Sequence, residues 1–488
     1  MNAAKLDKLC LWHPFTQMQE WMEPRFEPVV IVEGKGAELI DANGKRYLDG
    51  NSSIWTNLHG HRHPVLNAAI KRQLDKLAHS SFLGLTNEVA PALGARLLDV
   101  TRLKGRKYRV FFSDDGSTAI EAGLKMIIQA RRQRGETQRK NFITLEGGYH
   151  GDTVGAMSLG RSGLFHKHFG ALMFPTCKVM APFCYRCPFN RARPCRGADA
   201  RESRRCKWEC LDELRRAMKQ RGAGAAAFVA EPLVQGAAGM LMHPHGYLKE
   251  AAEICKQHGV WLMLDEVMTG FGRTGAMFAF QRERAIPDVL ALAKGLSGGY
   301  LPLAATIASA EIFEAFLGNF SEFKTFFHGH SYTGNQLGCA AALANLDIFE
   351  AEGTIKTIAR KSLLLRRLSK IFWEHPNVGD VRQEGMILAV ELVEDFSSKR
   401  PFPPAQRLGQ QVCDAARVRG LLTRPLGNVL LLMPPYCTTE KQLEKMVAAL
   451  WDGLNDVLPR PKASALNGAR KKTAGGRHGW ELTYSGVK

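Results

Sequence analysis

VWLMLDEVMTGFGRTGAMFAFQRERAIPDVLALAKGLSGGYLP, residues 260–302, contains two short apolar runs that each end at a charged residue. The first run ends at Asp265, and the second run, residues 289–293, is followed by Lys294. Apolar runs of this length between turn residues are typical of buried parallel strands. Because open α/β sheets bind ligands at the carboxyl ends of their strands, we expect Asp265 and Lys294 at the same rim of one sheet.

An acid and a lysine at such a rim have two interpretations. Pyridoxal phosphate (PLP) needs an amine that holds it as a Schiff base and an acid that keeps its ring nitrogen protonated. Burial disfavours the ammonium form of a lysine and so favours the neutral, nucleophilic amine. A salt bridge between the ends of two core strands would use the same residue types. Asp265 and Lys294 alone therefore favour neither interpretation.

Length and composition indicate a large globular protein. Its 488 residues, 45% of them hydrophobic, suggest roughly two to four domains. No apolar run approaches the ~18 residues of a membrane helix. The N-terminus lacks the apolar stretch of a secretory signal, so we expect a cytoplasmic protein without membrane association. The 11 cysteines are an odd number for a disulfide framework and fit a reducing compartment.

The formal net charge of +19 is concentrated in residues 186–207 and in the tail from residue 459. A basic, Gly- and Ala-rich tail, residues 459–488, is typical of a solvated, disordered extension. A basic nucleic-acid-binding or metal-stabilised protein is the alternative of a different class. This alternative gives Asp265 and Lys294 at the strand ends no role, so we expect no specific nucleic-acid partner.

A second candidate site lies where a predicted strand, residues 108–112, meets a helix. The junction reads SDDGSTAIEAGLKMIIQA (113–130), with Ile120, Leu124 and Ile127 at helical spacing. Gly116 and Ser117 open this helix, where free backbone N–H groups, a hydroxyl and the positive end of the helix dipole could bind a phosphate. An ordinary N-terminal cap would use the same residue types.

A third feature is an aromatic residue that follows the predicted strand 142–145. The sequence continues as EGGYHGDTVGAMSLG (146–160), in which two glycines precede Tyr149. A sharp turn there would leave the ring at the sheet rim, either stacked on a planar cofactor or packed in the turn. Strands and helices alternate from residue 108 to 309, which predicts a mainly parallel sheet with right-handed crossovers.

Two elements before this region are also predicted. Residues 38–48, ELIDANGKRYL, predict a β-hairpin with a type I′ turn at Asn43-Gly44. A helix is predicted from Pro64 onward. Its apolar face would hold Leu66, Ile70, Leu74 and Leu77.

Two features of the second half are candidate binding segments. SEFKTFFHGHSYTGN (321–335) has no helical period, and residues 328–331 in it could offer hydroxyl and amide donors to a phosphate. LLTRPLGNVLLLMPP (421–435) predicts a strand, a turn and a second strand. Arg424 at that turn could bind a carboxylate bidentately or be an ordinary surface arginine.

Residues 177–210 form an Arg- and Cys-rich segment that we interpret as an insertion. Its cysteines could hold a structural zinc or a cluster, but only one tight CxxC pair is present. Reduced thiols or a labile disulfide are favoured over a metal. His59, His61 and His63 also lack a suitably placed acid or cysteine, so we expect no metal. The six cysteines are Cys177, Cys184, Cys187, Cys195, Cys206 and Cys210.

Four motifs resemble the class III aminotransferases of the fold-type I PLP superfamily, over about residues 10–457. They are SDDGSTAIEAGLKM, GGYHGDT, LDEVMTGFGRTG and ALAKGLSGGYLP, in that order. The resemblance implies an α/β fold with a mainly parallel seven-stranded sheet in a large domain and a smaller α+β domain from both chain ends. Residues 1–60 would form an arm and part of the small domain, 61–338 the large PLP-binding domain, and 339–458 the rest of the small domain.

The resemblance also implies roles for individual residues. Lys294 would hold PLP as a Schiff base and carry protons, and Asp265 would pair with the ring nitrogen. Because Ser331 would reach the phosphate from a second subunit, the resemblance implies a homodimer with shared active sites. The other implied residues are Gly116, Ser117, Tyr149 and His330 for the cofactor, and Phe15, Trp55, Tyr149, Gly329 and Arg424 for the substrate.

Within the family, LWHPFTQM, NSSIWTNLHGH, FFHGHSYTGNQLGC and TRPLGNVLLLMPPY are similar to members that aminate 8-amino-7-oxononanoate in biotin synthesis. Arg424 would then bind the substrate carboxylate, and S-adenosylmethionine would be the expected amino donor. Phe15, Ile54 and His330-Ser331 depart from many adenosylmethionine-using members and resemble lysine-using ones, so both donors stay open. Another class III ω-aminotransferase is the remaining alternative within the family.

Overall fold

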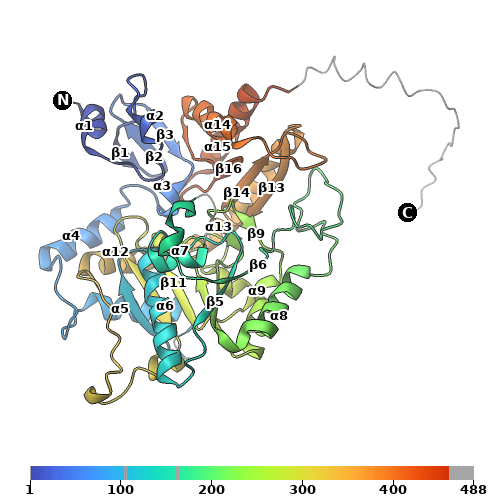
Figure 1. Ribbon diagram of the computed structural model, residues 1–488. Helices are drawn as coiled ribbons and strands as arrows, with labels where there is room; N and C mark the ends of the chain where they lie inside the picture. The colour runs from blue at the N-terminus through green and yellow to red at the C-terminus, as the bar shows by residue number, and fades with distance from the viewer. Residues whose placement is uncertain (1, 104, 106, 161–164, 461–488) are drawn as a thin grey trace, which may run out of the picture.

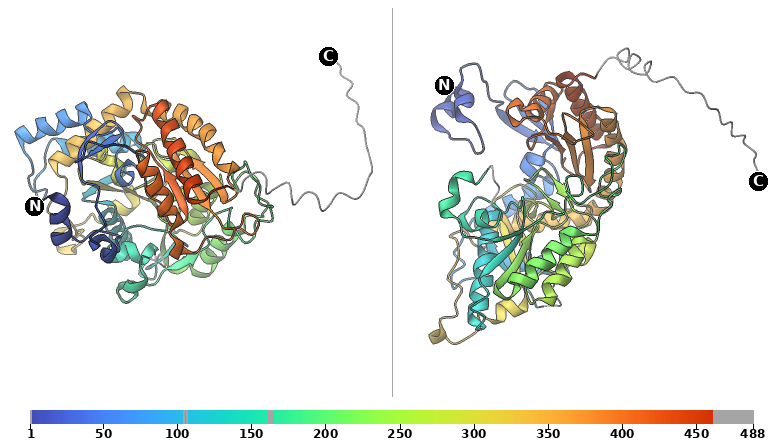
Figure 2. Two further views of the ribbon diagram at one scale, coloured as in Figure 1. Left: turned by 90° about the horizontal axis from the view of Figure 1, so that it is seen from above. Right: turned by 45° about the vertical axis from the view of Figure 1, so that its right-hand side comes forward.

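The computed structural model describes residues 2–103, 105, 107–160 and 165–460. Figure 1 shows a layered part around a central sheet, and a second part in which the N-terminal hairpin lies beside the C-terminal helices. The same arrangement is visible from two further directions in Figure 2. The predicted tail lies almost wholly outside the described residues. Across those residues, no helix is long and apolar enough to cross a membrane.

The layered part is built on a sheet of seven strands, β4 (Arg109–Ser113), β5 (Asn141–Leu145), β6 (Cys177–Val179), β7 (Ala225–Ala230), β10 (Trp261–Asp265), β11 (Val289–Leu292) and β12 (Ala304–Ala308). Their spatial order is β4-β12-β11-β10-β7-β5-β6. Neighbours from β11 to β6 run parallel, whereas β12 is antiparallel to β11 and to β4. The prediction of a mainly parallel seven-stranded sheet is confirmed.

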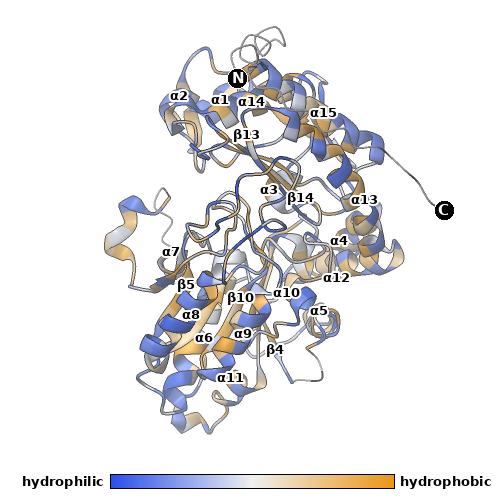
Figure 3. Cartoon of the chain, turned by 90° about the vertical axis from the view of Figure 1, so that its right-hand side faces the viewer, coloured by the Kyte–Doolittle hydropathy of each residue, from blue (hydrophilic) through white to orange (hydrophobic). Residues whose placement is uncertain are grey.

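Helices cover both faces of this sheet. They are α4 (Pro64–Lys76), α5 (Val89–Val100), α6 (Gly116–Gln133), α7 (Val154–Gly160), α8 (Glu209–Arg221), α9 (Tyr247–Gln257), α11 (Ala310–Glu314) and α12 (Gln336–Ala351). Figure 3 shows the strands in orange between helices that carry both hydrophilic and hydrophobic residues. This is the layering that apolar strands and amphipathic helices predict.

Successive residues of β10 enter two different hydrophobic cores, because side chains alternate across a strand. Leu262 and Leu264 pack in the core that contains α5, α8 and α9. Trp261 and Met263 pack in the opposite core, which contains α6. Both faces of the strand are therefore buried, and its carboxyl end is left as the place where a polar residue meets a ligand.

Helix α6 begins where the chain leaves β4. The Asp115 carboxylate accepts the Thr118 N–H at 3.0 Å, and the Thr118 hydroxyl accepts the Asp115 N–H at 2.9 Å. This reciprocal pair is a capping box, which fixes the start of the helix. Ile120, Leu124 and Ile127 are buried against the sheet, as their spacing predicts.

The predicted apolar face of α4 is buried only in its first half. Leu66 is buried with residues of α12, whereas Leu74 and Leu77 are 57% and 44% exposed. The predicted helix is present, and its apolar face is covered only in part in the single chain. The physical reason is that α12 covers α4 around Leu66 and Ala69 and not beyond.

The second part of the molecule combines the two ends of the chain. Its first sheet contains β1 (Ile31–Lys35), β2 (Glu38–Asp41), β3 (Arg46–Asp49) and β15 (Leu421–Leu422), in that order. Its second sheet contains β13 (Val378–Glu384), β14 (Ile387–Leu392) and β16 (Val429–Leu432). The predicted strand–turn–strand at 421–435 is present, but its strands join different sheets. The helices here are α13 (Thr354–Leu368), α14 (Leu408–Val418) and α15 (Glu440–Val457).

The hairpin of β2 and β3 is confirmed, but its turn is not of type I′. That turn needs a positive φ at both central residues, whereas only Gly44 of the pair has one, at +80°. The Asp41 carboxylate accepts the N–H groups of Asn43 and Lys45, each at 2.9 Å. These side-chain bonds favour a turn in which only the glycine is left-handed.

The segment interpreted as an insertion has regular structure at both ends. Residues 177–179 form the edge strand β6, and Cys210 lies in α8, so the irregular part spans residues 180–208. Two of its arginines fasten it to the second part of the molecule: Arg201 lies 2.6 Å from Glu384, and Arg186 lies 2.7 Å from Glu391. All eleven cysteines are free thiols. Among the described residues, no group of three or more His, Cys, Asp or Glu is arranged to hold a metal ion.

Candidate active site

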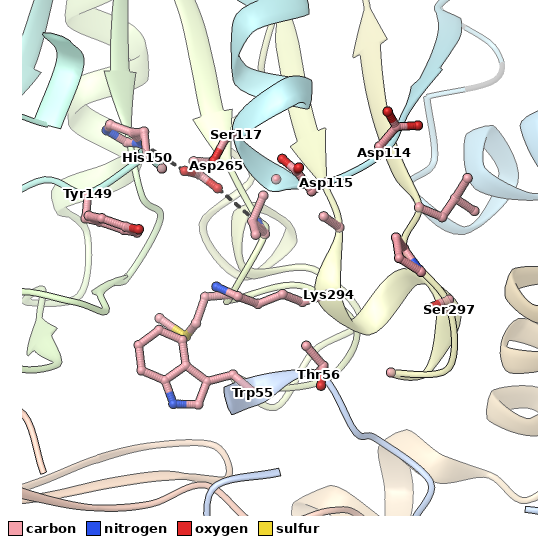
Figure 4. A pocket seen from close by; sticks show the side chains of 18 of the residues that line it. Trp55, Thr56, Asp114, Asp115, Ser117, Tyr149, His150, Asp265, Lys294 and Ser297 are labelled. Carbon is pink, nitrogen blue, oxygen red and sulfur yellow. Dashed lines mark hydrogen bonds and ion pairs between the residues drawn. The ribbon is translucent and has the colours of Figure 1, made fainter. Parts of the chain in front are cut away.

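A cavity of about 450 Å³ opens at the carboxyl ends of the central strands. Its volume is within the range of small-molecule sites. Asp265 follows from β10 and Lys294 from β11, and both line the cavity as predicted (Figure 4). Four other predicted residues also line it: Trp55, Gly116, Ser117 and Tyr149.

Lys294 is held in a strained backbone conformation two residues after β11 ends at Leu292. Its φ of 44° is left-handed, which is uncommon for a residue with a side chain and persists only where the surroundings enforce it. The Nζ atom lies over the ring of Trp55, 4.8 Å from its centroid. Burial lowers the pKa of Lys294, against the opposing effect of the charges on Asp265 and Glu231. The neutral amine is therefore more populated at Lys294 than at an exposed lysine.

Trp55 is presented by a run of four left-handed residues, Ser52–Trp55, with φ between 46° and 73°. The buried Asp49 carboxylate accepts the N–H and the hydroxyl of Ser53, each at 2.9 Å. The Trp55 indole N–H donates to Asn51 Oδ1 at 2.8 Å. These bonds offset the strain of the turn, and the indole is fixed beneath the lysine amine.

Asp265 is held by an imidazole and a backbone amide. His150 Nδ1 lies 2.8 Å from Asp265 Oδ2, and the Val267 N–H donates to Oδ1 at 3.0 Å. Burial disfavours the imidazolium, yet the bond to Asp265 and its charge raise the pKa of His150 above its ordinary value. The imidazole and the Val267 N–H fix the orientation of the Asp265 carboxylate at the cavity, where it could hold a proton on a ring nitrogen.

Glu231 supports the turn that carries Tyr149. Its Oε1 accepts the Tyr149 N–H at 3.0 Å, and its Oε2 accepts the Gly236 N–H at 2.7 Å. Burial raises the pKa of Glu231 to about 7. At the other end of the side chain, the Tyr149 hydroxyl donates to Asp152 at 2.7 Å. The ring of Tyr149 is thus fixed at both ends beside the cavity.

The opposite end of the cavity is formed by the first turn of α6. N–H groups of a first helical turn have no partner within the helix, and the helix dipole favours an anion there. Gly151 lies so close that an added Cβ would meet Ser117 Oγ at 2.0 Å, and its φ is +122°. Gly116 and Ser117, which could hold an anion, line one cavity with the Lys294 amine, and this arrangement would fit a small phosphorylated aldehyde.

Two predicted substrate residues lie near the cavity without lining it. The Arg424 guanidinium donates to the Phe15 carbonyl at 3.5 Å. The Phe15 ring meets Phe165 at 5.6 Å between centroids, and Phe165 meets Tyr149 at 6.2 Å. A continuous chain of contacts therefore leads from Arg424 to the Tyr149 ring.

The predicted phosphate loop is also outside the cavity of the single chain. Gly329 and Ser331 are exposed, and His330 is half-buried. His330 Nδ1 lies 2.6 Å from Asp114 Oδ2, and Asp114 does line the cavity. The structure thus connects His330 to the site through an acid that the sequence analysis did not single out.

Sequence reasoning also missed His150, Asp152 and Glu231. His150 and Asp152 stand within the motif GGYHGDT, beside the tyrosine that was singled out. Glu231 follows β7 in the same way that Asp265 ends β10. Their positions at strand ends were the available signal, whereas the His150–Asp265 contact joins residues 115 positions apart.

This geometry agrees with what is known of related sequences. The family model for class III aminotransferases matches residues 20–454. The chain belongs to the class III aminotransferases. The match covers both parts of the molecule and every residue of the cavity described above, so this aminotransferase has the fold-type I architecture that the motifs implied.

Several relatives of this aminotransferase carry a more specific name. Adenosylmethionine-8-amino-7-oxononanoate aminotransferase from Geobacter sulfurreducens is 49% identical over 92% of this chain and 97% of that protein. The Methanocaldococcus jannaschii enzyme of the same name has a crystal structure with a TM-score of 0.86 at 41% identity, covering 93% of this chain and 98% of that chain. An amine transaminase from an uncultivated Pseudomonas species, solved in its PLP-bound form, gives 0.83 at 35% identity, covering 92% and 99%.

Proposed function

We propose that this class III aminotransferase binds PLP and transfers an amino group to 8-amino-7-oxononanoate, forming 7,8-diaminononanoate for biotin synthesis. The observation that carries the proposal is the buried Lys294 amine in one cavity with the His150-bound carboxylate of Asp265. The names of the relatives support the choice of substrate.

Four residues that line the cavity have tasks in this chemistry. Bound PLP supplies the electron sink for the carbon that loses or gains the amine. Asp265 holds the proton on the ring nitrogen. Lys294, whose pKa is lowered by burial, would hold the aldehyde and move the proton of the reacting carbon. Gly116 and Ser117 bind the phosphate.

The substrate would enter along the contacts that lead to Tyr149. Arg424 has a planar guanidinium that can bind the carboxylate of 8-amino-7-oxononanoate through two parallel hydrogen bonds. Phe15, Trp55 and Tyr149 supply apolar surface for the carbon chain. We assign S-adenosylmethionine as the amino donor from the relatives' names, with lysine as the alternative.

The active sites are proposed to be completed by a homodimer. Leu83, Phe320 and Phe327 are among the large apolar side chains exposed in the single chain, at 88%, 90% and 72%. Exposed apolar surface of this kind marks an interface. A second copy that covers it would bring Gly329 and Ser331 of the partner subunit to the phosphate end of the site. We place the enzyme in the cytoplasm, where its eleven free thiols would stay reduced.

A donor panel tests the proposed reaction. The purified enzyme is mixed with S-adenosylmethionine, lysine or glutamate, and the visible absorbance of bound PLP is followed before and after 8-amino-7-oxononanoate is added. The proposal predicts loss of the absorbance with S-adenosylmethionine, its return with the oxo acid, and 7,8-diaminononanoate in the product mixture. No product from this acceptor with any of the three donors would contradict it.

A further inference from the structure

We propose that His330 positions the cofactor indirectly, by offsetting the negative charge of Asp114 beside the bound phosphate. The inference rests on the proposed function, because the phosphate is that of PLP. It assigns His330 a task that differs from the direct phosphate contact expected from the sequence.

Asp114 is placed where an unpaired carboxylate would oppose phosphate binding. It lies two positions before Gly116, and both residues line the same cavity. Its side chain is half-buried, with 39% of its surface exposed, so solvent screens its charge only in part. A negative charge that lines the cavity disfavours a second negative group in it.

The neighbouring acids are already bonded to backbone N–H groups. The Asp115 carboxylate accepts the Thr118 N–H at 3.0 Å as the cap of α6. The Glu121 carboxylate accepts the Gly155 and Ala156 N–H groups at 2.6 and 3.2 Å. Asp114 differs, because among the described residues its carboxylate has a side chain as its partner, the imidazole of His330.

The loop that carries His330 presents the imidazole to Asp114. The His330 N–H donates to Thr333 Oγ1 at 3.0 Å, and the Thr333 N–H donates to the His330 carbonyl at 3.1 Å. His79 Nε2 lies 2.8 Å from the Ser331 carbonyl. These bonds fix the loop within its own chain. Since a carboxylate can only accept, His330 Nδ1 donates the hydrogen bond to it.

The same loop contains a histidine that serves as a matched control. His328 Nδ1 lies 3.1 Å from the amine of Lys125, and its ring stacks on Phe111. Its replacement removes an imidazole from the loop without releasing a carboxylate. A loss of loop order alone would therefore affect both histidine variants, whereas a charge effect would be confined to His330.

The test is a double-mutant cycle in cofactor affinity. PLP is removed from the purified enzyme and titrated back into the wild type and into the His330→Ala, Asp114→Asn and Asp114→Asn/His330→Ala variants. We expect His330→Ala to raise the Kd for PLP about tenfold, because the carboxylate is then uncompensated. The double variant should return to within about threefold of the wild type, and His328→Gln should bind PLP normally.

Pyridoxal, which has no phosphate, separates charge from packing. Its Kd should be the same for the wild type and for His330→Ala. An unchanged PLP affinity in His330→Ala, or a double variant as weak as His330→Ala, would overturn the inference. His330→Gln is measured in parallel in case the alanine variant does not fold. Failure of the proposed function is a distinct result, since the wild type itself would then bind no PLP.

Discussion

His150 fixes the orientation of Asp265, and so a buried imidazole positions the carboxylate proposed to hold the proton of the cofactor ring. The two side chains are almost fully buried and lie 2.8 Å apart. The next titratable group, Glu231, is also buried but makes its hydrogen bonds to backbone N–H groups. The pKa of His150 is raised by its carboxylate partner, whereas that of Glu231 is raised by burial.

Replacing His150 by Gln should lower kcat at least about tenfold, which corresponds to roughly 1.4 kcal/mol of lost transition-state stabilisation. The glutamine amide does not reach Asp265 from the Nδ1 position, whereas the amide of His150→Asn can replace that donor. We expect KM for the oxo acid to change less than about twofold. Steady-state kinetics and the position of the cofactor's visible band check this, and equal activity of the glutamine variant and the wild type would contradict it.

Glu231 gives the folded protein a specific pH dependence. Burial raises its folded-state pKa to about 7, above the ~4.3 of an exposed glutamate. A carboxyl with a raised pKa stabilises the folded state below about pH 4, and that contribution is lost as the pH rises through about 7. Glu231→Gln should therefore flatten the fall in Tm between pH 5 and pH 8. Thermal melts across this range check the sign, and parallel curves for both proteins would argue against it.

At the scale of elements, the site depends on short turns more than on the strands and helices between which they run. The left-handed run Ser52–Trp55 places an indole under Lys294, and the turn after β5 brings Gly151 against Ser117. Both turns have backbone angles that few residues adopt. Substitutions there should change the site while the sheet stays intact.

Gly151→Ala should weaken PLP binding by about tenfold or more. The added Cβ would lie 2.0 Å from Ser117 Oγ, so the hydroxyl must move away from the phosphate end. Gly135→Ala is the matched control, because its φ of +80° is equally left-handed but its Cβ meets nothing within 4 Å. Titration of both enzymes with PLP checks this prediction, and equal affinities would show that Ser117 does not bind the phosphate.

The helices and strands were the most predictable part of the structure, because the spacing of apolar residues and the choice of turn residues act locally. The strands before Asp265 and Lys294, and the helix after Gly116, follow from those signals. The bond from His150 to Asp265 did not, since it depends on which strands become neighbours in the sheet. The predicted type I′ turn was also wrong, because hydrogen bonds to the Asp41 side chain favour a different turn.

At the scale of the whole molecule, one exposed apolar surface remains to be covered. Leu74 and Leu77, on the predicted apolar face of α4, are exposed in the single chain. Leu83 and Phe327 are exposed on segments that are also held near each other, since His79 bonds to Ser331. The sequence could not distinguish burial within a chain from burial between chains, because both require the same residue types.

Phe327→Glu should convert a dimer into monomers and remove most of the activity. A carboxylate at the proposed interface would be buried without a partner on the second copy. Leu363→Glu is the matched control, since Leu363 is 69% exposed on α13 and outside this surface. Size-exclusion chromatography with light scattering checks the prediction. An active, dimeric Phe327→Glu enzyme would place the interface elsewhere.

The most direct test of the central claim is to identify the lysine that binds PLP. The enzyme is reduced with borohydride, digested and analysed by peptide mass spectrometry, with Lys294→Ala treated in parallel. The account predicts a phosphopyridoxyl group on the peptide that contains Lys294, and neither label nor visible cofactor absorbance in the variant. A label on a different lysine, or an active Lys294→Ala enzyme, would contradict it.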